Sequence, residues 1–155
     1  MPDSQSLRDA VKQIFSEYLT SKGMRRTPER FAILEAVYSI DHHFEIEYLY
    51  SLMLSDSRFH VSRATIYNTM VLLMDARLVV RNQFGGTAQY EKCYKRENHH
   101  HLICTQCGKV IEFQNEAIQN AIMGARYSRF SMSQYSLSVY GLCSKCERLN
   151  RKKKK

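Results

Sequence analysis

The chain has 155 residues, of which 44% are hydrophobic and 25% charged, and its formal net charge is +8. This length accommodates one ordinary domain or two small ones, and the apolar fraction is sufficient for a core. No apolar run approaches the ~20 residues of a membrane-spanning helix, and the polar start MPDSQSLRDAV is unlike a secretory signal. We therefore expect a cytoplasmic protein without a membrane partner, in which cysteine pairs bind metal or do chemistry more often than they form disulfides.

The positive charge favours an anionic partner, nucleic acid first, but it is unevenly distributed. Residues 1–93 contain 11 basic and 11 acidic residues, whereas residues 94–155 contain 12 basic and 4 acidic ones. Four of these charges form the terminal run 152–155, a pattern typical of a solvated tail. A DNA-binding prediction must therefore depend on local features of the first half, not on the overall charge.

Apolar residues at helical spacing predict four helices in the first half, at 6–19, 28–40, 45–54 and 63–76. Thr27-Pro28 is a typical helix start, with Thr as the N-cap and Pro in the first helical position, and Ser62 is a second candidate N-cap. At 100° per residue, the fourth helix has an inner side and an opposite side. The inner side contains Ile66, Thr69, Met70 and Leu73, and the opposite side contains Ala64, Tyr67, Asn68 and Val71.

Two strands, 78–84 and 87–93, flank Gly85-Gly86 and predict a hairpin. Helices followed by a hairpin indicate a winged helix, in which the fourth predicted helix reads DNA. An asparagine can pair with adenine, and an alanine or an aromatic ring can contact a thymine methyl. Arginines around this helix are candidate phosphate contacts: Arg25, Arg26, Arg30, Arg58, Arg63, Arg77 and Arg81. The alternatives are a generic α/β domain and arginines that are merely exposed.

These patterns predict an α+β protein with four segments. Residues 1–93 form a winged-helix DNA-binding domain, 94–98 a linker, 99–147 an α/β metal-binding domain, and 148–155 a basic, disordered tail. Within the second domain we expect short strands around the first Cys-x-x-Cys, a helix over 116–127 and a strand over roughly 130–142.

Four cysteines form two Cys-x-x-Cys pairs separated by 35 residues: Cys104, Cys107, Cys143 and Cys146. Each pair can direct two thiolates at one ion, and two pairs complete a closed tetrahedral site typical of structural Zn²⁺. Such a site contributes folding energy directly. Redox dithiols or disulfides are the alternative. Cys93 is left over, as a buried thiol or an additional ligand.

The histidines indicate a second, harder site. In a strand, His99 and His101 share one face and His100 points to the other. Glu112, Glu91 and the His42-His43 pair are candidate partners. A mixed imidazole and carboxylate set suits Fe²⁺, Mn²⁺, Zn²⁺ or Co²⁺, so two separate metal sites are expected. The alternative is that the histidines are ordinary exposed strand residues.

Several motifs occur in an order that resembles one family. They are TPER (27–30), DHHF (41–44), RATIYNTM (63–70), a Gly-Gly wing ending in Glu91, HHHLICTQCGKVIEF (99–113) and YGLCSKC (140–146). This order, over roughly Leu19 to Cys146, is similar to the ferric uptake regulator (Fur) family of metal-sensing bacterial repressors. The resemblance implies that 99–147 is a C-terminal α/β dimerisation domain and that the linker at 94–98 is a hinge. It further implies a homodimer on a palindromic operator, a structural zinc site and a regulatory metal site at the hinge, with Fe²⁺ as the first expectation.

By position, the resemblance assigns the structural zinc to Cys104, Cys107, Cys143 and Cys146. It assigns the regulatory metal to His43, Glu91, His99, His101 and Glu112. It assigns DNA contacts to Arg25, Arg63, Ala64, Tyr67 and Asn68. A further metal site of many relatives corresponds to Asn98, His100, Gln119 and Tyr135, where only His100 is a good ligand, so we expect that site to be absent or weak.

Other branches of the family remain open at this stage. Peroxide-sensing members depend on aspartates where this chain has Glu91 and Glu112, which disfavours peroxide sensing. Zinc-sensing members have a cysteine near the wing, as this chain has in Cys93. Manganese sensing is a further alternative. Outside the family, a metalloenzyme would need an open coordination position, a substrate pocket and an acid or base, none of which a motif supplies, so no small-molecule substrate is expected. A zinc-ribbon interaction module is the remaining class.

Overall fold

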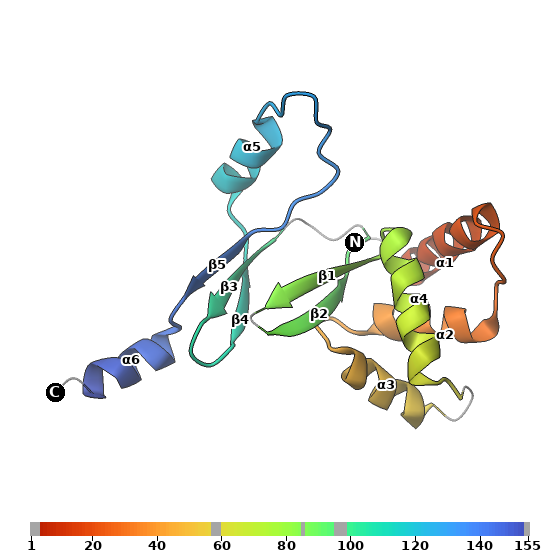
Figure 1. Cartoon of the computed structure of the whole chain (residues 1–155), viewed down its shortest axis with the longest axis horizontal. Coiled ribbons are helices and arrows are strands. Elements are labelled where there is room, and N and C mark those ends of the chain that lie inside the picture. The colour runs from red at the N-terminus through yellow and green to blue at the C-terminus, as the bar shows by residue number, and fades with distance from the viewer. Residues whose placement is uncertain (1–3, 57–59, 85, 95–98, 154–155) are drawn as a thin grey trace. The chain divides into compact units, whose positions relative to one another are not determined.

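The computed structural model describes residues 4–56, 60–84, 86–94 and 99–153. The chain divides into two compact units, Met1–Arg96 and Glu97–Lys155, each with its own secondary structure (Figure 1). The predicted hinge linker at 94–98 falls mainly on residues 95–98, outside the described residues. Among the described residues, no helix is both long and apolar enough to cross a membrane.

Four helices form most of the N-terminal unit: α1 (Ser4–Ser21), α2 (Pro28–Ser39), α3 (Ile46–Ser55) and α4 (Arg63–Asp75). Helix α1 ends because Gly23 has a φ of +64° and the amide of Met24 donates to the carbonyl of Leu19 at 2.8 Å, a turn that favours glycine. Helix α2 begins at the expected proline, although the Thr27 side chain makes no capping hydrogen bond. Ser62 does cap α4, accepting from the amide of Thr65 at 3.1 Å.

One hydrophobic core joins these helices to the hairpin. Its most deeply buried members include Phe15, Leu34, Leu49, Ile66 and Leu73, each 0% exposed. The predicted inner side of α4 is confirmed, because Ile66, Thr69, Met70 and Leu73 are all buried. Packing therefore fixes the rotation of α4 and leaves its opposite side exposed.

Strands β1 (Val79–Phe84) and β2 (Thr87–Lys92) pair antiparallel, as predicted; Gly85 lies outside the described residues. Phe44 adds to β2: its amide donates to the carbonyl of Tyr90 at 3.0 Å, and the amide of Tyr90 donates back at 2.8 Å. The hairpin following α2, α3 and α4 is the expected winged-helix arrangement. The bridge at Phe44 also holds the His42-His43 segment beside β2.

The C-terminal unit is built on a three-stranded sheet in the order β4-β3-β5 (Figure 1). Strand β3 (His100–Cys104) pairs antiparallel with β4 (Val110–Phe113) and parallel with β5 (Ser138–Gly141). Helix α5 (Glu116–Gly124) follows β4 and contains no buried residue, and α6 (Ser144–Lys153) follows β5. The short β3 therefore organises the whole unit.

Two expectations for this unit need correction. The strand expected over roughly 130–142 is only Ser138–Gly141, because β3 offers five residues to pair with and alternation alone supplies no partner backbone. Residues 148–153 are not a disordered tail but the continuation of α6. Glu147 and Arg151 form an i,i+4 ion pair at 2.8 Å there, and cations in the last turn complement the helix dipole.

Candidate metal centres and nucleic-acid interface

The four cysteines of the two Cys-x-x-Cys pairs come together in the C-terminal unit. Their sulfur atoms all lie within 4.8 Å of one another, and all four are free thiols. The parallel pairing of β3 with β5 sets Cys104 opposite Gly141, which brings the second pair to the end of β3. Gly108, with a φ of +71°, completes the turn of the first pair. Four sulfur donors in this cluster fit a closed tetrahedral metal site.

Backbone amides prepare this cluster for thiolate ligands. The amide of Cys143 donates to the sulfur of Cys104 at 3.3 Å. Hydrogen bonds from the amides of Cys143 and Cys107 lower the pKa of Cys104 to about 6, and the amide of Cys146 lowers the pKa of Cys143. Burial raises the pKa of Cys146, so a cation is needed to hold all four sulfurs in the charged form that binds metal.

In the N-terminal unit, His43 and Glu91 form the first part of the predicted imidazole-carboxylate set. Nε2 of His43 lies 3.4 Å from Oε1 of Glu91. The Phe44–Tyr90 bridge causes this contact, because the residues beside that bridge are brought side by side. The His43 ring also packs edge-on against Phe84, with ring centroids 5.2 Å apart. The neighbouring His42 packs instead on Tyr48, with centroids 5.3 Å apart, so only one member of the pair faces the carboxylate.

Asn82 supports Glu91 from the adjacent strand, a role that sequence reasoning missed. Its Nδ2 donates to Oε1 of Glu91 at 2.6 Å, and both side chains are buried. Asn82 pairs in register with Gln89, so it is the diagonal neighbour of Glu91 on the same face of the hairpin. The signal available in the sequence was a polar residue, Asn82, in the middle of a strand whose end residues, Val79 and Phe84, are apolar and buried.

In the C-terminal unit, His99, His101 and Glu112 share one side of the sheet. The rings of His99 and His101 lie 4.8 Å apart between centroids, as expected for residues two apart in an extended segment. His101 pairs in register with Glu112, which makes the imidazole and the carboxylate cross-strand neighbours. The predicted alternation is confirmed. Glu112 is exposed, and of the three only His99 and His101 have ligand atoms within 4.8 Å of each other in a cluster of donors.

His100 faces the other side and packs into an aromatic cluster. Its ring lies 5.2 Å from that of Phe113 and 5.9 Å from that of Tyr135, between centroids. The ring is 1% exposed, and neither of its nitrogens has a hydrogen-bond partner among the described residues. Asn98, which the resemblance placed beside it, lies outside the described residues.

Among the described residues, Cys93 belongs to neither group of clustered metal-ligating side chains. Its thiol donates to the carbonyl of Arg77 at 3.1 Å, and burial raises its pKa to about 11. A thiol held protonated in this way is a poor metal ligand.

The exposed side of α4 is the candidate nucleic-acid interface. Ala64, Tyr67, Asn68 and Val71 are exposed, with Tyr67 at 50% and Val71 at 51%. Apolar groups of this size on the outside of a capped helix, opposite a packed core, match a surface that contacts bases in a groove. Arg25 is also exposed, in the segment before α2.

Arg63, at the start of α4, is held by partners that the sequence did not reveal. Its guanidinium donates to Glu47 of α3 at 3.0 and 3.1 Å and stacks over the ring of Tyr50, 4.0 Å from its centroid. These hydrogen bonds raise the pKa of Arg63 and lower that of Glu47. The arginine is thus oriented before any phosphate is present.

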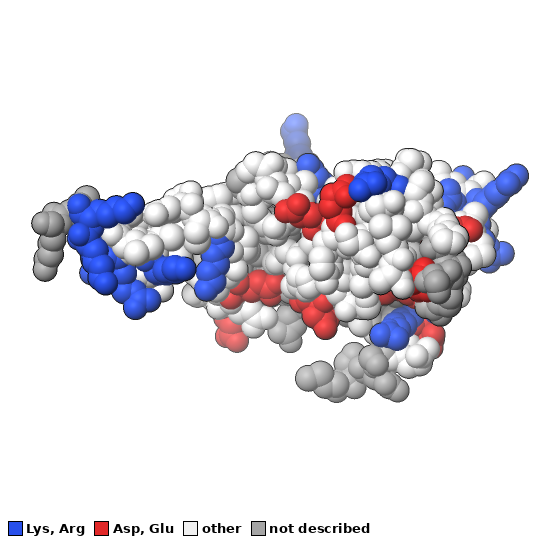
Figure 2. Space-filling model, turned by 90° about the horizontal axis from the view of Figure 1, so that it is seen from below, with Lys and Arg blue, Asp and Glu red and all other residues white. Residues whose placement is uncertain are grey.

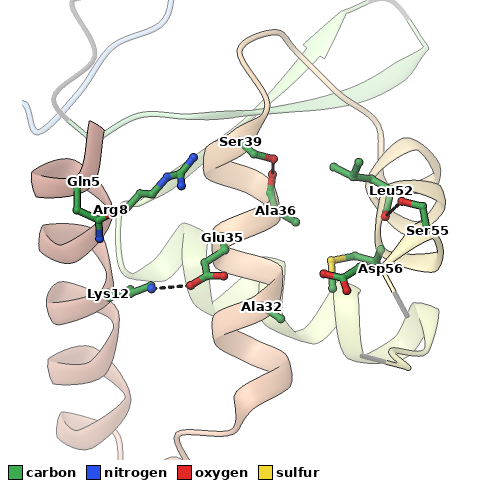
Figure 3. A pocket seen from close by; sticks show the side chains of 11 residues that line it. Gln5, Arg8, Lys12, Ala32, Glu35, Ala36, Ser39, Leu52, Ser55 and Asp56 are labelled. Atoms are coloured by element: carbon green, nitrogen blue, oxygen red, sulfur yellow. Dashed lines mark hydrogen bonds and ion pairs between the residues drawn. The ribbon is translucent and has the colours of Figure 1, made fainter. Parts of the chain in front are cut away.

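A hollow in the N-terminal unit does not resemble a chemical site. It measures about 740 Å³ and lies among α1, α2 and α3, where Lys12 and Glu35 form an ion pair at 2.5 Å (Figure 3). Ser39 and Ser55 donate to backbone carbonyls of their own helices. The described residues around it form no cluster of metal-ligating groups, so we assign no function to it.

Comparison with known proteins places these features in one family. Residues 21–140 match the model of the ferric uptake regulator family. The chain is 33% identical over 151 residues to a ferric uptake regulation protein of Legionella pneumophila, covering 95% of this chain and 100% of that one. It is 30% identical over 141 residues to one of Campylobacter jejuni, covering 89% of each. It is also 30% identical to a peroxide-responsive repressor of Staphylococcus aureus, covering 83% and 86%.

Solved structures agree with this placement. A ferric uptake regulator from Pseudomonas aeruginosa with manganese has a TM-score of 0.70 at 28% identity, covering 83% of this chain and 97% of that one. A zinc-bound manganese uptake regulator has a TM-score of 0.55 at 34% identity, covering 83% and 98%.

Proposed function

Because the chain belongs to the ferric uptake regulator family and is therefore a metal-responsive transcriptional regulator and not an enzyme, we propose that it is an iron-responsive repressor of metal-homeostasis genes. It would act in the cytoplasm on double-stranded operator DNA. The observation that carries this proposal is the contact of His43 with Glu91 at 3.4 Å, held by the Phe44–Tyr90 bridge. An imidazole and a carboxylate, the latter supported by the buried amide of Asn82, have the donor chemistry of a metal site.

We propose that the regulatory ion is bound by His43 and Glu91 together with His99, His101 and Glu112. The first two belong to the N-terminal unit and the other three to the C-terminal unit. When bound, a divalent cation supplies the one point of charge on which imidazole nitrogens and carboxylate oxygens can converge. The residues would then restrict the angle between the units, because the ligands come from both of them.

Restricting that angle would control DNA binding. In a dimer, two recognition helices must enter successive major grooves about 34–36 Å apart. We propose that α4 enters the groove, with Ala64, Tyr67 and Asn68 at base edges and Arg25 and Arg63 contacting the DNA around them. The switch is a difference in metal affinity between the open and closed arrangements, and an almost complete switch needs roughly 5.5 kcal/mol.

For the four-cysteine cluster we propose structural Zn²⁺. The donor set is soft and closed, and the C-terminal unit needs the additional stability because its sheet buries few apolar side chains and α5 none. Metal binding would tie β5 to β3 and contribute folding free energy.

We also propose that the C-terminal units pair in a homodimer. Large apolar side chains are exposed there on β3, β4, β5 and α5: Leu102, Ile111, Met123, Val139 and Tyr140. A monomeric soluble unit rarely exposes so many together, and a second copy would cover them.

Single histidine substitutions test the proposed regulatory site. His43→Ala is expected to abolish Fe²⁺-dependent binding to operator DNA, as is His101→Ala, because each removes a ligand. His42→Ala is the matched control, since His42 packs on Tyr48 instead of facing Glu91. The measurement is a gel shift with and without Fe²⁺, with zinc content measured alongside. Operator binding by His43→Ala and His101→Ala with the metal response of the parent chain would refute the assignment.

Titration with different metals separates the runner-up functions. The 34% identity to a zinc-bound manganese uptake regulator favours Zn²⁺ or Mn²⁺ as the alternative signal, and the relative from Staphylococcus aureus raises peroxide sensing. DNA-binding titrations across Fe²⁺, Mn²⁺ and Zn²⁺ identify the metal. Loss of DNA binding after brief peroxide treatment, if seen only with Fe²⁺ bound, would favour the peroxide branch.

A further inference from the structure

Helix α6 gathers much of the positive charge of the C-terminal unit. Between Ser144 and Lys153 the chain has one acidic residue, Glu147, and five basic ones: Lys145, Arg148, Arg151, Lys152 and Lys153. Figure 2 shows Lys and Arg side chains gathered at the α6 end of the chain, with little acidic surface beside them in this view. Two further lysines follow in the sequence.

One side of α6 is anchored to the four-cysteine cluster. Cys146, in the first turn, is 4% exposed and belongs to the cluster. One turn later, Nδ2 of Asn150 donates to Oε1 of Gln106, in the turn of the first Cys-x-x-Cys, at 2.9 Å. Residues four apart lie on the same side of a helix, so Cys146 and Asn150 together fix which side of α6 faces the cluster.

The opposite side is basic. At 100° per residue, Arg148 and Lys152 lie about 160–240° around the helix from the anchoring pair, and both are exposed. Among the described residues, neither forms an ion pair with an acidic side chain, whereas Arg151 is neutralised by Glu147. Arg148 and Lys152 are themselves four apart, which places them about 6 Å apart along the helix axis.

The needs of the helix itself do not account for this charge. Cations in the last turn complement the helix dipole, which explains Arg151, Lys152 and Lys153. Lys145 lies in the first turn, where a cation is unfavourable, and Arg148 lies in the middle. Lys145 and Arg148 are therefore not explained by the helix dipole, and their place on the side away from the anchor indicates a surface that serves an external anion.

We propose that the outward side of α6, formed by Lys145, Arg148 and Lys152, binds the phosphate backbone of duplex DNA and adds sequence-independent affinity. Charge complementarity and membership of a family of DNA-binding regulators identify the partner. Single-stranded nucleic acid is disfavoured because α6 has no aromatic residue on which a base can stack. The cysteine cluster holds the helix in place beforehand, which reduces the ordering cost of binding.

This contact would not depend on the regulatory metal, so it can be tested separately from the proposed function. Affinity for a duplex of random sequence is measured by fluorescence anisotropy over a series of salt concentrations. The protein carries Zn²⁺ at the four-cysteine cluster, and no regulatory metal is added. The double variant Arg148→Gln/Lys152→Gln is compared with Arg126→Gln/Arg129→Gln, which removes two exposed charges elsewhere in the same unit.

For the α6 variant, the slope of log affinity against log salt is expected to become shallower by about 0.9 per lost phosphate contact, or about 1.8 per chain. The control should keep the parent slope, as should the charge-retaining variant Arg148→Lys/Lys152→Arg. Equal slopes for the two charge-removing variants would overturn the proposal, as would stronger competition by single-stranded RNA than by duplex DNA. If the double variant loses zinc, Lys152→Gln alone must lower the slope by about half as much.

Discussion

Removing the amide of Asn82 tests how the N-terminal part of the proposed regulatory site is supported. In Asn82→Ala, Glu91 loses the hydrogen bond that it accepts at 2.6 Å. Asn82 is 7% exposed and Glu91 3%, so bulk water cannot freely replace the donor. We expect the carboxylate to lose its fixed orientation toward His43, although both proposed ligands remain.

The size of the effect follows from this geometry. A hydrogen bond to a charged group contributes roughly 1.5–3 kcal/mol, and loss of a residue that orients a ligand typically costs about 10–100-fold in metal affinity. These ranges agree, because about 1.4 kcal/mol corresponds to a factor of ten. We therefore expect the Fe²⁺ or Mn²⁺ dissociation constant to rise about 10–100-fold, and the metal-free protein to lose roughly 1–3 kcal/mol of unfolding free energy.

Two measurements distinguish orientation of a ligand from a purely structural role. Metal affinity is obtained by competition with a chelating dye under conditions where the variant is fully folded, and stability is obtained from urea unfolding without metal. Gln83→Ala is the matched control, because Gln83 is the next residue of β1 and is exposed on the other face. If Asn82→Ala lost stability but bound metal as tightly as the parent chain, the orienting role would be refuted.

Two further predictions concern the N-terminal unit. Leu73→Ala should lower the free energy of unfolding by about 2–5 kcal/mol, because Leu73 is 0% exposed. Val71→Ala, at a 51% exposed site of the same helix, should change it by about 0.5 kcal/mol or less. Urea unfolding measures both, and similar losses for the two variants would contradict the assignment of the two sides of α4. Hydrogen bonds from Arg63 lower the pKa of Glu47 below 4.5, so the ion pair stabilises the fold above about pH 4.5 and this contribution disappears as pH falls through the lowered pKa. Glu47→Gln should thus be less stable than the parent chain at neutral pH, and the two stabilities should converge in acid. Thermal unfolding across a pH series measures this, and a stability difference that does not depend on pH would contradict the pairing.

The sequence by itself determined the parts of the structure that depend on local chemistry. Proline in a first turn, the Ser62 cap and the spacing of apolar residues define where helices begin and which side of α4 is buried, because these effects act within a few residues. The Cys-x-x-Cys spacing likewise predicted that the four thiols cluster, since two residues between thiolates allow both to face one ion. Strand alternation alone separates His100 from His99 and His101, because successive side chains of a strand point to opposite faces.

Only the tertiary structure decided which distant groups meet. His43 contacts Glu91 because a two-hydrogen-bond bridge joins Phe44 to Tyr90, and Asn82 supports Glu91 through the register of the hairpin. Glu47 and Tyr50 hold Arg63 through the packing of α3 against α4. Residues 144–153 form a helix whose first turns are anchored by Cys146 and Asn150. The free energy of such contacts appears only after the chain has closed the intervening loops, so no local pattern records them.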